Sequence, residues 1–113
     1  ICPATPLSLV KWYLDQVDLL TIMTVEIGYA GQKFIPQMLG KIAEAKDLLL
    51  ENDYHYIIQI DGAIGRQVYK PLFDNGARAF VMGTSGLFKP GVELSEACQL
   101  MKKEFSDETG VIL

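Results

Sequence analysis

Short apolar runs alternate along this chain with longer stretches in which apolar residues return every three or four positions. Three short runs are rich in β-branched residues and predict strands: 19–25, 56–60 and 79–82. The longer stretches predict helices with one apolar face: about 6–17, 35–51, 66–75 and 94–104. This alternation is typical of an α/β fold, in which helices cover a parallel sheet.

Turn-forming residues mark several ends of these elements. Thr5 and Pro6 are expected to be the N-cap and the first residue of the first helix. Pro71 is expected to kink or shorten the third helix, and Gly76 fits the C′ position after it.

Three aromatic residues are expected to pack between helices and sheet: Trp12, Tyr13 and Phe73. Three apolar strand residues are expected on the inner face of the sheet: Ile57, Ile60 and Val81.

The composition narrows the class of protein. A chain of 113 residues is long enough for one small domain. Its net charge is −4, from 10 basic and 14 acidic residues, without a Lys/Arg cluster, so we expect no nucleic-acid partner. No apolar run approaches the roughly 18 residues of a membrane span, so we expect no membrane partner. Cys2 and Cys98 lie far apart, which favours a reducing compartment, and we expect a cytoplasmic protein.

Each predicted strand is followed closely by a Gly-x-x-Gly tetrad: Gly28–Gly31, Gly62–Gly65 and Gly83–Gly86. In a parallel sheet the carboxyl ends of the strands share one edge, where α/β proteins bind ligands. Glycine lets backbone N–H groups approach an anion, and successive N–H groups in a turn form a concave donor site. The three tetrads therefore predict one phosphate site. The alternative is that glycine serves here only as a common turn former.

Asp61 ends an apolar strand directly before Gly62. A carboxylate in that position faces the ligand site and can bind a metal or donate and accept a proton. The alternative is a turn-forming aspartate. Met23 lies near the same face, although core packing is the simpler explanation for it.

His55 lies in a polar stretch typical of a solvated loop. Because it is the single histidine, a multi-histidine metal site cannot be built from this chain alone.

Four segments resemble motifs of the ribulose-phosphate 3-epimerase family. Residues 23–36 are similar to its M-S/T-V-x-P-G-F-G/A-G-Q-x-F-I-P segment, and residues 60–64 resemble its V-D-G-G-I strand end. Residues 2–6 resemble its N-P-A-T-P motif. Residues 83–88 are closer to the D-allulose-6-phosphate 3-epimerase branch than to the pentose enzymes. The resemblance follows the order and spacing of the motifs to about Phe105.

The resemblance implies a TIM (β/α)8 barrel, a fold of about 250 residues with roughly 31 residues in each strand–helix unit. At that size the chain contains about 3.6 units. Ile1 and Cys2 would end the fifth strand, and the three predicted strands would be the sixth to eighth. We therefore expect residues 1–113 to be a single partial barrel domain that lacks the first four βα units. The chain begins at Ile1 without a signal peptide, so we expect a processed N-terminus or one piece of a longer protein.

The resemblance also implies an isomerase that epimerises a ketose phosphate at C3 through a metal-stabilised enediolate. The substrate would be allulose 6-phosphate, giving fructose 6-phosphate, or ribulose 5-phosphate, giving xylulose 5-phosphate. Asp61 would be one of two catalytic aspartates and a ligand of a divalent ion (Zn, Mn, Fe, Co or Mg), and Met23 would line the site near the reacting carbon. Nine residues would hold the phosphate: Gly28, Tyr29, Ala30, Gly31, Gly62, Ala63, Gly83, Thr84 and Ser85. The full-length enzyme would be a homo-oligomer.

Several positions depart from the family pattern. Ile27 replaces a proline, Ala63 replaces the second glycine of D-G-G, and Cys2 replaces an asparagine. The serine, histidines and second aspartate of the family's first three strands have no counterparts here. We therefore expect the isolated chain to be inactive. The alternative function is a non-catalytic barrel fragment or degenerate homologue that binds sugar phosphate or a partner chain.

Overall fold

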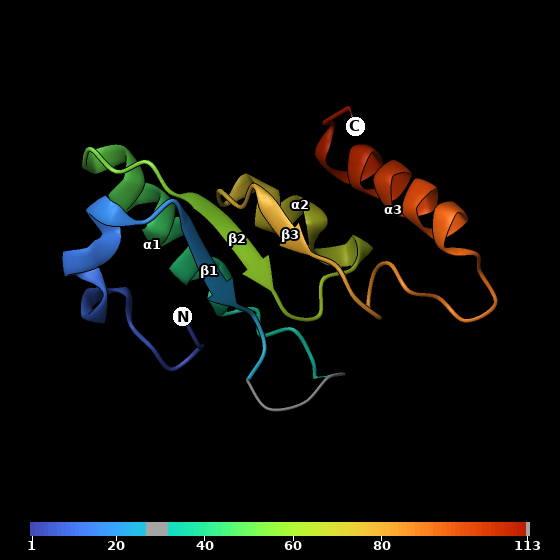
Figure 1. Cartoon of the computed structure of the whole chain (residues 1–113), viewed down its shortest axis with the longest axis horizontal. Coiled ribbons are helices and arrows are strands. Elements are labelled where there is room, and N and C mark those ends of the chain that lie inside the picture. The colour runs from blue at the N-terminus through green and yellow to red at the C-terminus, as the bar shows by residue number, and fades with distance from the viewer. Residues whose placement is uncertain (27–31, 113) are drawn as a thin grey trace.

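The computed structural model describes residues 1–26 and 32–112, and its centre is a parallel sheet in the order β1-β2-β3 (Figure 1). The strands are β1 (Leu19–Met23), β2 (Ile57–Asp61) and β3 (Ala79–Val81). The helices are α1 (Met38–Glu51), α2 (Arg66–Asp74) and α3 (Leu94–Thr109). Figure 1 shows α1 and α2 behind the sheet, with α3 next to α2. The predicted α/β fold with a parallel sheet is confirmed for these residues.

The two faces of the sheet differ in what covers them. Successive side chains of a strand point to opposite faces, so alternate residues share one environment. Ile22, Ile58 and Ile60 are buried in the core beneath the helices, whereas Leu19 and Ile57 are exposed on the other face. The prediction that Ile60 shares the inner face with Ile57 and Val81 is therefore wrong, because Ile60 follows Ile57 by three positions, an odd step that places the two side chains on opposite faces.

The segment before β1 is helical, but it is not the continuous helix predicted over 6–17. It forms two 3-10 helices, η1 (Leu7–Leu9) and η2 (Lys11–Gln16), and the N-cap of η1 is Pro6 without a side-chain cap from Thr5. Leu7 and Leu14 are buried, and they anchor the segment to the core. Trp12 and Tyr13 are exposed, so their predicted packing against the sheet is wrong.

The longer helices agree with their predicted ranges except at the ends. α1 begins three residues later than predicted, after the turn at Pro36. α2 runs through Pro71 to Asp74, followed by Gly76 at φ 119°, as expected for a C′ glycine. α3 continues to Thr109, five residues beyond the prediction, and Gly110 ends it at φ 78°.

Two side chains tie α1 to neighbouring segments. The Lys41 ammonium donates hydrogen bonds to the carbonyl oxygens of Cys2, Pro3 and Thr5, at 3.1, 2.8 and 2.7 Å. The Tyr56 hydroxyl donates to the carbonyl of Ala45 at 2.6 Å. Burial, aided by the nearby Tyr54, raises the pKa of Tyr56 to about 12, so the phenol keeps the proton that it donates.

Ile1 lies alongside the outer edge of β1, as expected for the end of a strand. Its amino group donates to the Thr21 carbonyl at 2.6 Å, and the N–H of Met23 donates back to its carbonyl at 2.8 Å. Within residues 1–26 and 32–112, no strand pairs with the outer edge of β3.

The uncovered face of the sheet predicts how this chain behaves in solution. Leu19 is 50% exposed, Ile57 is 51% exposed and Val81 is 40% exposed. Full burial of an apolar side chain contributes about 1.5–3 kcal/mol, and an unpaired strand edge is a template for association. We therefore expect the 113-residue chain to pair with a second copy, to recruit another chain over this face, or to be loosely packed.

Size-exclusion chromatography with light scattering measures this association. Near-UV circular dichroism reports the packing of Tyr69 against Phe105, whose ring centroids lie 5.3 Å apart. A monodisperse monomer with a cooperative unfolding transition would contradict the prediction.

Candidate functional site

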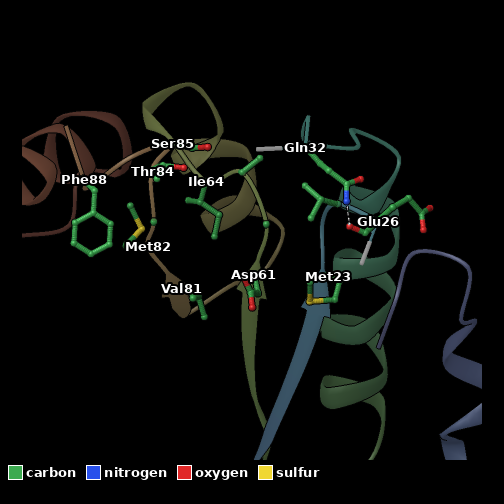
Figure 2. A pocket seen from close by; sticks show the side chains of 14 residues that line it. Met23, Glu26, Gln32, Asp61, Ile64, Val81, Met82, Thr84, Ser85 and Phe88 are labelled. Carbon is green, nitrogen blue, oxygen red and sulfur yellow. Dashed lines mark hydrogen bonds between the residues drawn. The ribbon is translucent and has the colours of Figure 1, made fainter. Parts of the chain in front are cut away.

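A pocket of about 390 Å³ lies at the carboxyl ends of the three strands. The structure brings seven of the predicted site residues together in its wall: Met23, Asp61, Gly62, Ala63, Gly83, Thr84 and Ser85. The remaining four predicted residues, Gly28, Tyr29, Ala30 and Gly31, lie outside the described residues. Glu26 and Gln32, which flank that segment, also line the pocket (Figure 2).

A row of three side chains crosses the floor of the pocket. The strand register pairs Met23 with Asp61 and Asp61 with Val81, so the three side chains project from the same face of the sheet. Figure 2 shows Asp61 between Met23 and Val81. In the part of the chain that the structure describes, the Asp61 carboxylate has no hydrogen-bond or ion-pair partner. It is therefore available to accept a proton or to bind a cation.

The turn after β2 has a backbone that few residue types tolerate. Gly62 has φ 137°, and a Cβ there would lie 2.8 Å from Val25 Cγ2 and 3.0 Å from Thr24 Oγ1. Ala63 has φ 54° and is the one non-glycine residue with positive φ among the described residues. An L-residue with a side chain is strained in this left-handed region by roughly 1–2 kcal/mol. The turn therefore requires glycine at 62 and holds alanine at 63 under strain.

The turn after β3 folds around one carbonyl group. The Gly83 carbonyl accepts N–H groups from Gly86, Leu87 and Phe88, at 3.4, 2.9 and 3.0 Å. A Cβ on Gly86 would overlap the carbonyl oxygen of Ile64. Gly83 differs, because a Cβ there would have no heavy atom within 4 Å. Its missing side chain therefore leaves open space beside the pocket.

Backbone N–H groups of the turns supply donors at the pocket, beside the side-chain hydroxyls of Thr84 and Ser85. The N–H groups of Ala63, Thr84 and Ser85 donate to no acceptor in the described part of the chain. The charged residues that line the pocket are acidic, Glu26 and Asp61. No lysine or arginine of the described chain lines the pocket, so an anion there would be bound by N–H groups of the turns, which form suitable concave donor sites, and by these hydroxyls.

The chemistry of the donor set limits what the pocket can do with a metal ion. Among residues 1–26 and 32–112, no group of three His, Cys, Asp or Glu side chains is arranged to hold a metal. Asp61 can supply one carboxylate ligand. The described residues alone do not complete a metal site, so the divalent ion stays a prediction.

Sequence reasoning missed Thr24, which follows Met23 directly and is fully buried. The residue type alone is ordinary at a strand end, but the family motif that residues 23–36 resemble has serine or threonine at this position, and that was the available signal. His55 was placed correctly in a solvated loop: its ring lies 2.7 Å from the Asp18 carboxylate, before the start of β2. Cys98 is half-buried on α3 and is a free thiol.

The described helices include none that is long and apolar enough to cross a membrane.

Comparison with known proteins gives one consistent family. The model of the ribulose-phosphate 3 epimerase family matches residues 1–88. A ribulose-phosphate 3-epimerase of Methanocaldococcus jannaschii is 34% identical over 109 residues, which cover 91% of this chain and 47% of that protein. The Escherichia coli K12 ribulose-phosphate 3-epimerase is 33% identical over 88 residues, covering 78% of this chain and 39% of its own length.

A chloroplastic ribulose-5-phosphate-3-epimerase of Arabidopsis thaliana is also similar, at 35% identity over 83 residues, or 74% of this chain and 30% of that protein. This chain therefore spans less than half the length of the relatives named here.

The strained backbone at Ala63 predicts that Ala63→Gly stabilises the chain. Glycine adopts φ 54° without the Cβ clash, which relieves the strain of the folded state. This gain outweighs the destabilisation caused by the greater conformational entropy that glycine gives the unfolded state. We expect the free energy of unfolding to rise by up to about 1 kcal/mol, measured as the shift of the urea midpoint at fixed protein concentration. Ala43→Gly on α1 is the control, expected to lower it by about 1 kcal/mol. Equal destabilisation by both changes would contradict the strain.

Proposed function

The chain belongs to the ribulose-phosphate 3-epimerase family, and on that premise we propose that it supplies the phosphate site and one acid–base group of an isomerase that inverts C3 of a ketose phosphate. One observation carries the proposal. A carboxylate without a partner, that of Asp61, shares a pocket with turns whose N–H groups have no acceptor in the described chain. Acid–base chemistry and phosphate binding are the two requirements of this reaction.

The carboxylate acts on the carbon next to the ketone. Asp61 accepts the proton from C3 on one face of the sugar, or returns it in the reverse direction, and a second group must act on the opposite face. That second group would come from outside the described residues. Met23 and Val81 flank Asp61 with apolar surface on the same face of the sheet.

The turns act on the other end of the substrate. Backbone N–H groups of Ala63, Thr84 and Ser85 bind the phosphate, assisted by the predicted tetrad at 28–31. A fixed phosphate restricts the sugar to orientations in which C3 lies near the carboxylate, which converts binding energy into rate. A divalent ion, when bound, would polarise the ketone, and Asp61 would be its ligand from the described chain.

Two ketose phosphates are candidates for the substrate. The relatives named above are ribulose-phosphate 3-epimerases, which favours ribulose 5-phosphate. The turn at 83–88 resembles the allulose-6-phosphate branch, which favours the longer sugar. In both cases the remaining strands of a barrel, which we propose to lie outside this chain, would cover the exposed face of the sheet and supply the second carboxylate.

Activity is the direct test of Asp61. The 113-residue chain alone is expected to turn over neither sugar, because one carboxylate cannot serve both faces of the carbon. A fusion behind the preceding part of the Methanocaldococcus jannaschii relative should be active, and Asp61→Asn in that fusion should lower kcat by about 10²–10⁴-fold. Asp107→Asn on α3 is the control and should leave kcat unchanged. A loss below tenfold at Asp61 would make it a turn residue only.

The open space beside Gly83 gives a clean test of the phosphate site. Gly83→Val places a branched side chain where the fold leaves room, so the pocket should be blocked while the fold is kept. We expect phosphorylated sugar to bind far more weakly and unphosphorylated sugar to bind as before, measured by isothermal titration. Gly40→Val, which also meets open space, is the control on α1. Equal weakening for both sugars would point to misfolding and against a phosphate site at Gly83.

A further inference from the structure

Thr24 is the one buried residue with a polar, non-aromatic side chain in the part of the chain that the structure describes. Each of its three hydrogen-bonding groups contacts a different residue. Its N–H donates to the Asp61 carbonyl at 3.0 Å, and its hydroxyl donates to the Gly62 carbonyl at 2.5 Å. Its own carbonyl accepts the N–H of Ile35 at 2.8 Å. Neither donor of Thr24 is left over for an anionic ligand.

These bonds join the two segments that flank the pocket. The chain leaves β1 at Met23 and returns to Thr24 through Ile35, so Thr24 closes the base of the connection 25–34. Its N–H and hydroxyl bind the carbonyl groups of two successive peptides, Asp61–Gly62 and Gly62–Ala63. Thr24 itself does not line the pocket, although Met23 and Val25 do.

The orientation of the functional groups depends on these two peptides. The Asp61 side chain is attached directly before the first, and the Ala63 N–H lies in the second, in one plane with the Gly62 carbonyl. Gly62 lies so close to Thr24 and Val25 that it has no room for a Cβ. A change in the direction of the Gly62 carbonyl would therefore turn the donor N–H of Ala63, while the bond from the Thr24 N–H holds the carbonyl of Asp61.

We propose that Thr24 is a positioning residue: its hydroxyl sets the 61–63 turn so that the Ala63 N–H faces the phosphate and the Asp61 carboxylate faces the reacting carbon. The proposal rests on the proposed function of the pocket and deepens it, because it assigns the geometry to a residue that contacts neither phosphate nor sugar. Without the hydroxyl, the part-buried Gly62 carbonyl loses its donor and the turn is free to rotate.

Phosphate titration of the 113-residue chain, followed through the amide signals of Ala63 and Thr84, tests the proposal with inorganic phosphate as the probe. Thr24→Val keeps the shape of the side chain and removes the donor, and it should weaken phosphate binding by about tenfold. Thr24→Ser keeps the hydroxyl and should bind within threefold of the unchanged chain. Thr21→Val is the matched control, because Thr21 lies on β1, donates to Gln59 at 2.8 Å and does not line the pocket. It should leave binding unchanged.

Two results would overturn the proposal. In the first, Thr24→Val binds phosphate within twofold of the unchanged chain. In the second, Thr24→Ser binds phosphate as weakly as Thr24→Val does. If Thr24→Val does not fold, Thr24→Cys replaces it. The thiol is a weak donor, so phosphate affinity should fall below that of Thr24→Ser, by less than the tenfold expected when the donor is lost. Unchanged affinity would overturn the proposal.

Failure of the proposed function gives a different result. If the unchanged chain binds no phosphate, the pocket is not a phosphate site, and hydrogen exchange then tests Thr24 separately. Relative to its intrinsic rate, exchange of the N–H of residue 24, which donates to the Asp61 carbonyl, should be at least tenfold faster in Thr24→Val than in Thr21→Val. Equal exchange in the two variants would show that the hydroxyl does not fix the turn.

Discussion

The turns after β2 and β3 are in direct backbone contact, and the arrangement of the pocket depends on that contact. A Cβ on Gly65 would lie 2.9 Å from the carbonyl oxygen of Ser85, and Gly86 is pressed in the same way against the carbonyl of Ile64. The contact is reciprocal, since each turn contributes one glycine and one carbonyl group. Because side chains are excluded there, the two turns lie close enough for their N–H groups to face one pocket.

The glycines of these turns are not equivalent, since Gly65 and Gly86 face the opposite turn and Gly62 faces Thr24 and Val25. Gly62, Gly65 and Gly86 are required by neighbouring atoms, whereas Gly83 has open space around it. Three glycines thus serve packing and one serves access to the pocket. Packing thus accounts for both glycines of Gly62–Gly65 and for one of Gly83–Gly86, and the tetrad Gly28–Gly31 lies outside the described residues. The interpretation as a phosphate site concerns Gly83, which has open space, and the N–H groups that the packed turns hold near the pocket.

Residues with a strong local signal could be placed from the sequence. The β-branched runs gave the three strands, and Asp61 before a glycine gave the charged end of β2, because these patterns reflect the backbone near each residue. The packing of Thr24, the face of Ile60 and the exposure of Trp12 could not be predicted in this way. Each depends on strand register or on which segment comes to lie nearby, which a local pattern does not contain.

The turn at residues 2–5 shows how a single cation can determine the path of a chain. The three hydrogens of the Lys41 ammonium point in three directions and meet three carbonyl groups that converge on it. Arginine carries the same charge, but its planar fork is suited to paired acceptors that lie in one plane. Exchange between the two basic residues is therefore not conservative at this position. A homologous sequence with arginine at the position of Lys41 would need a different course for the residues that precede its first helix, so the two sites should vary together.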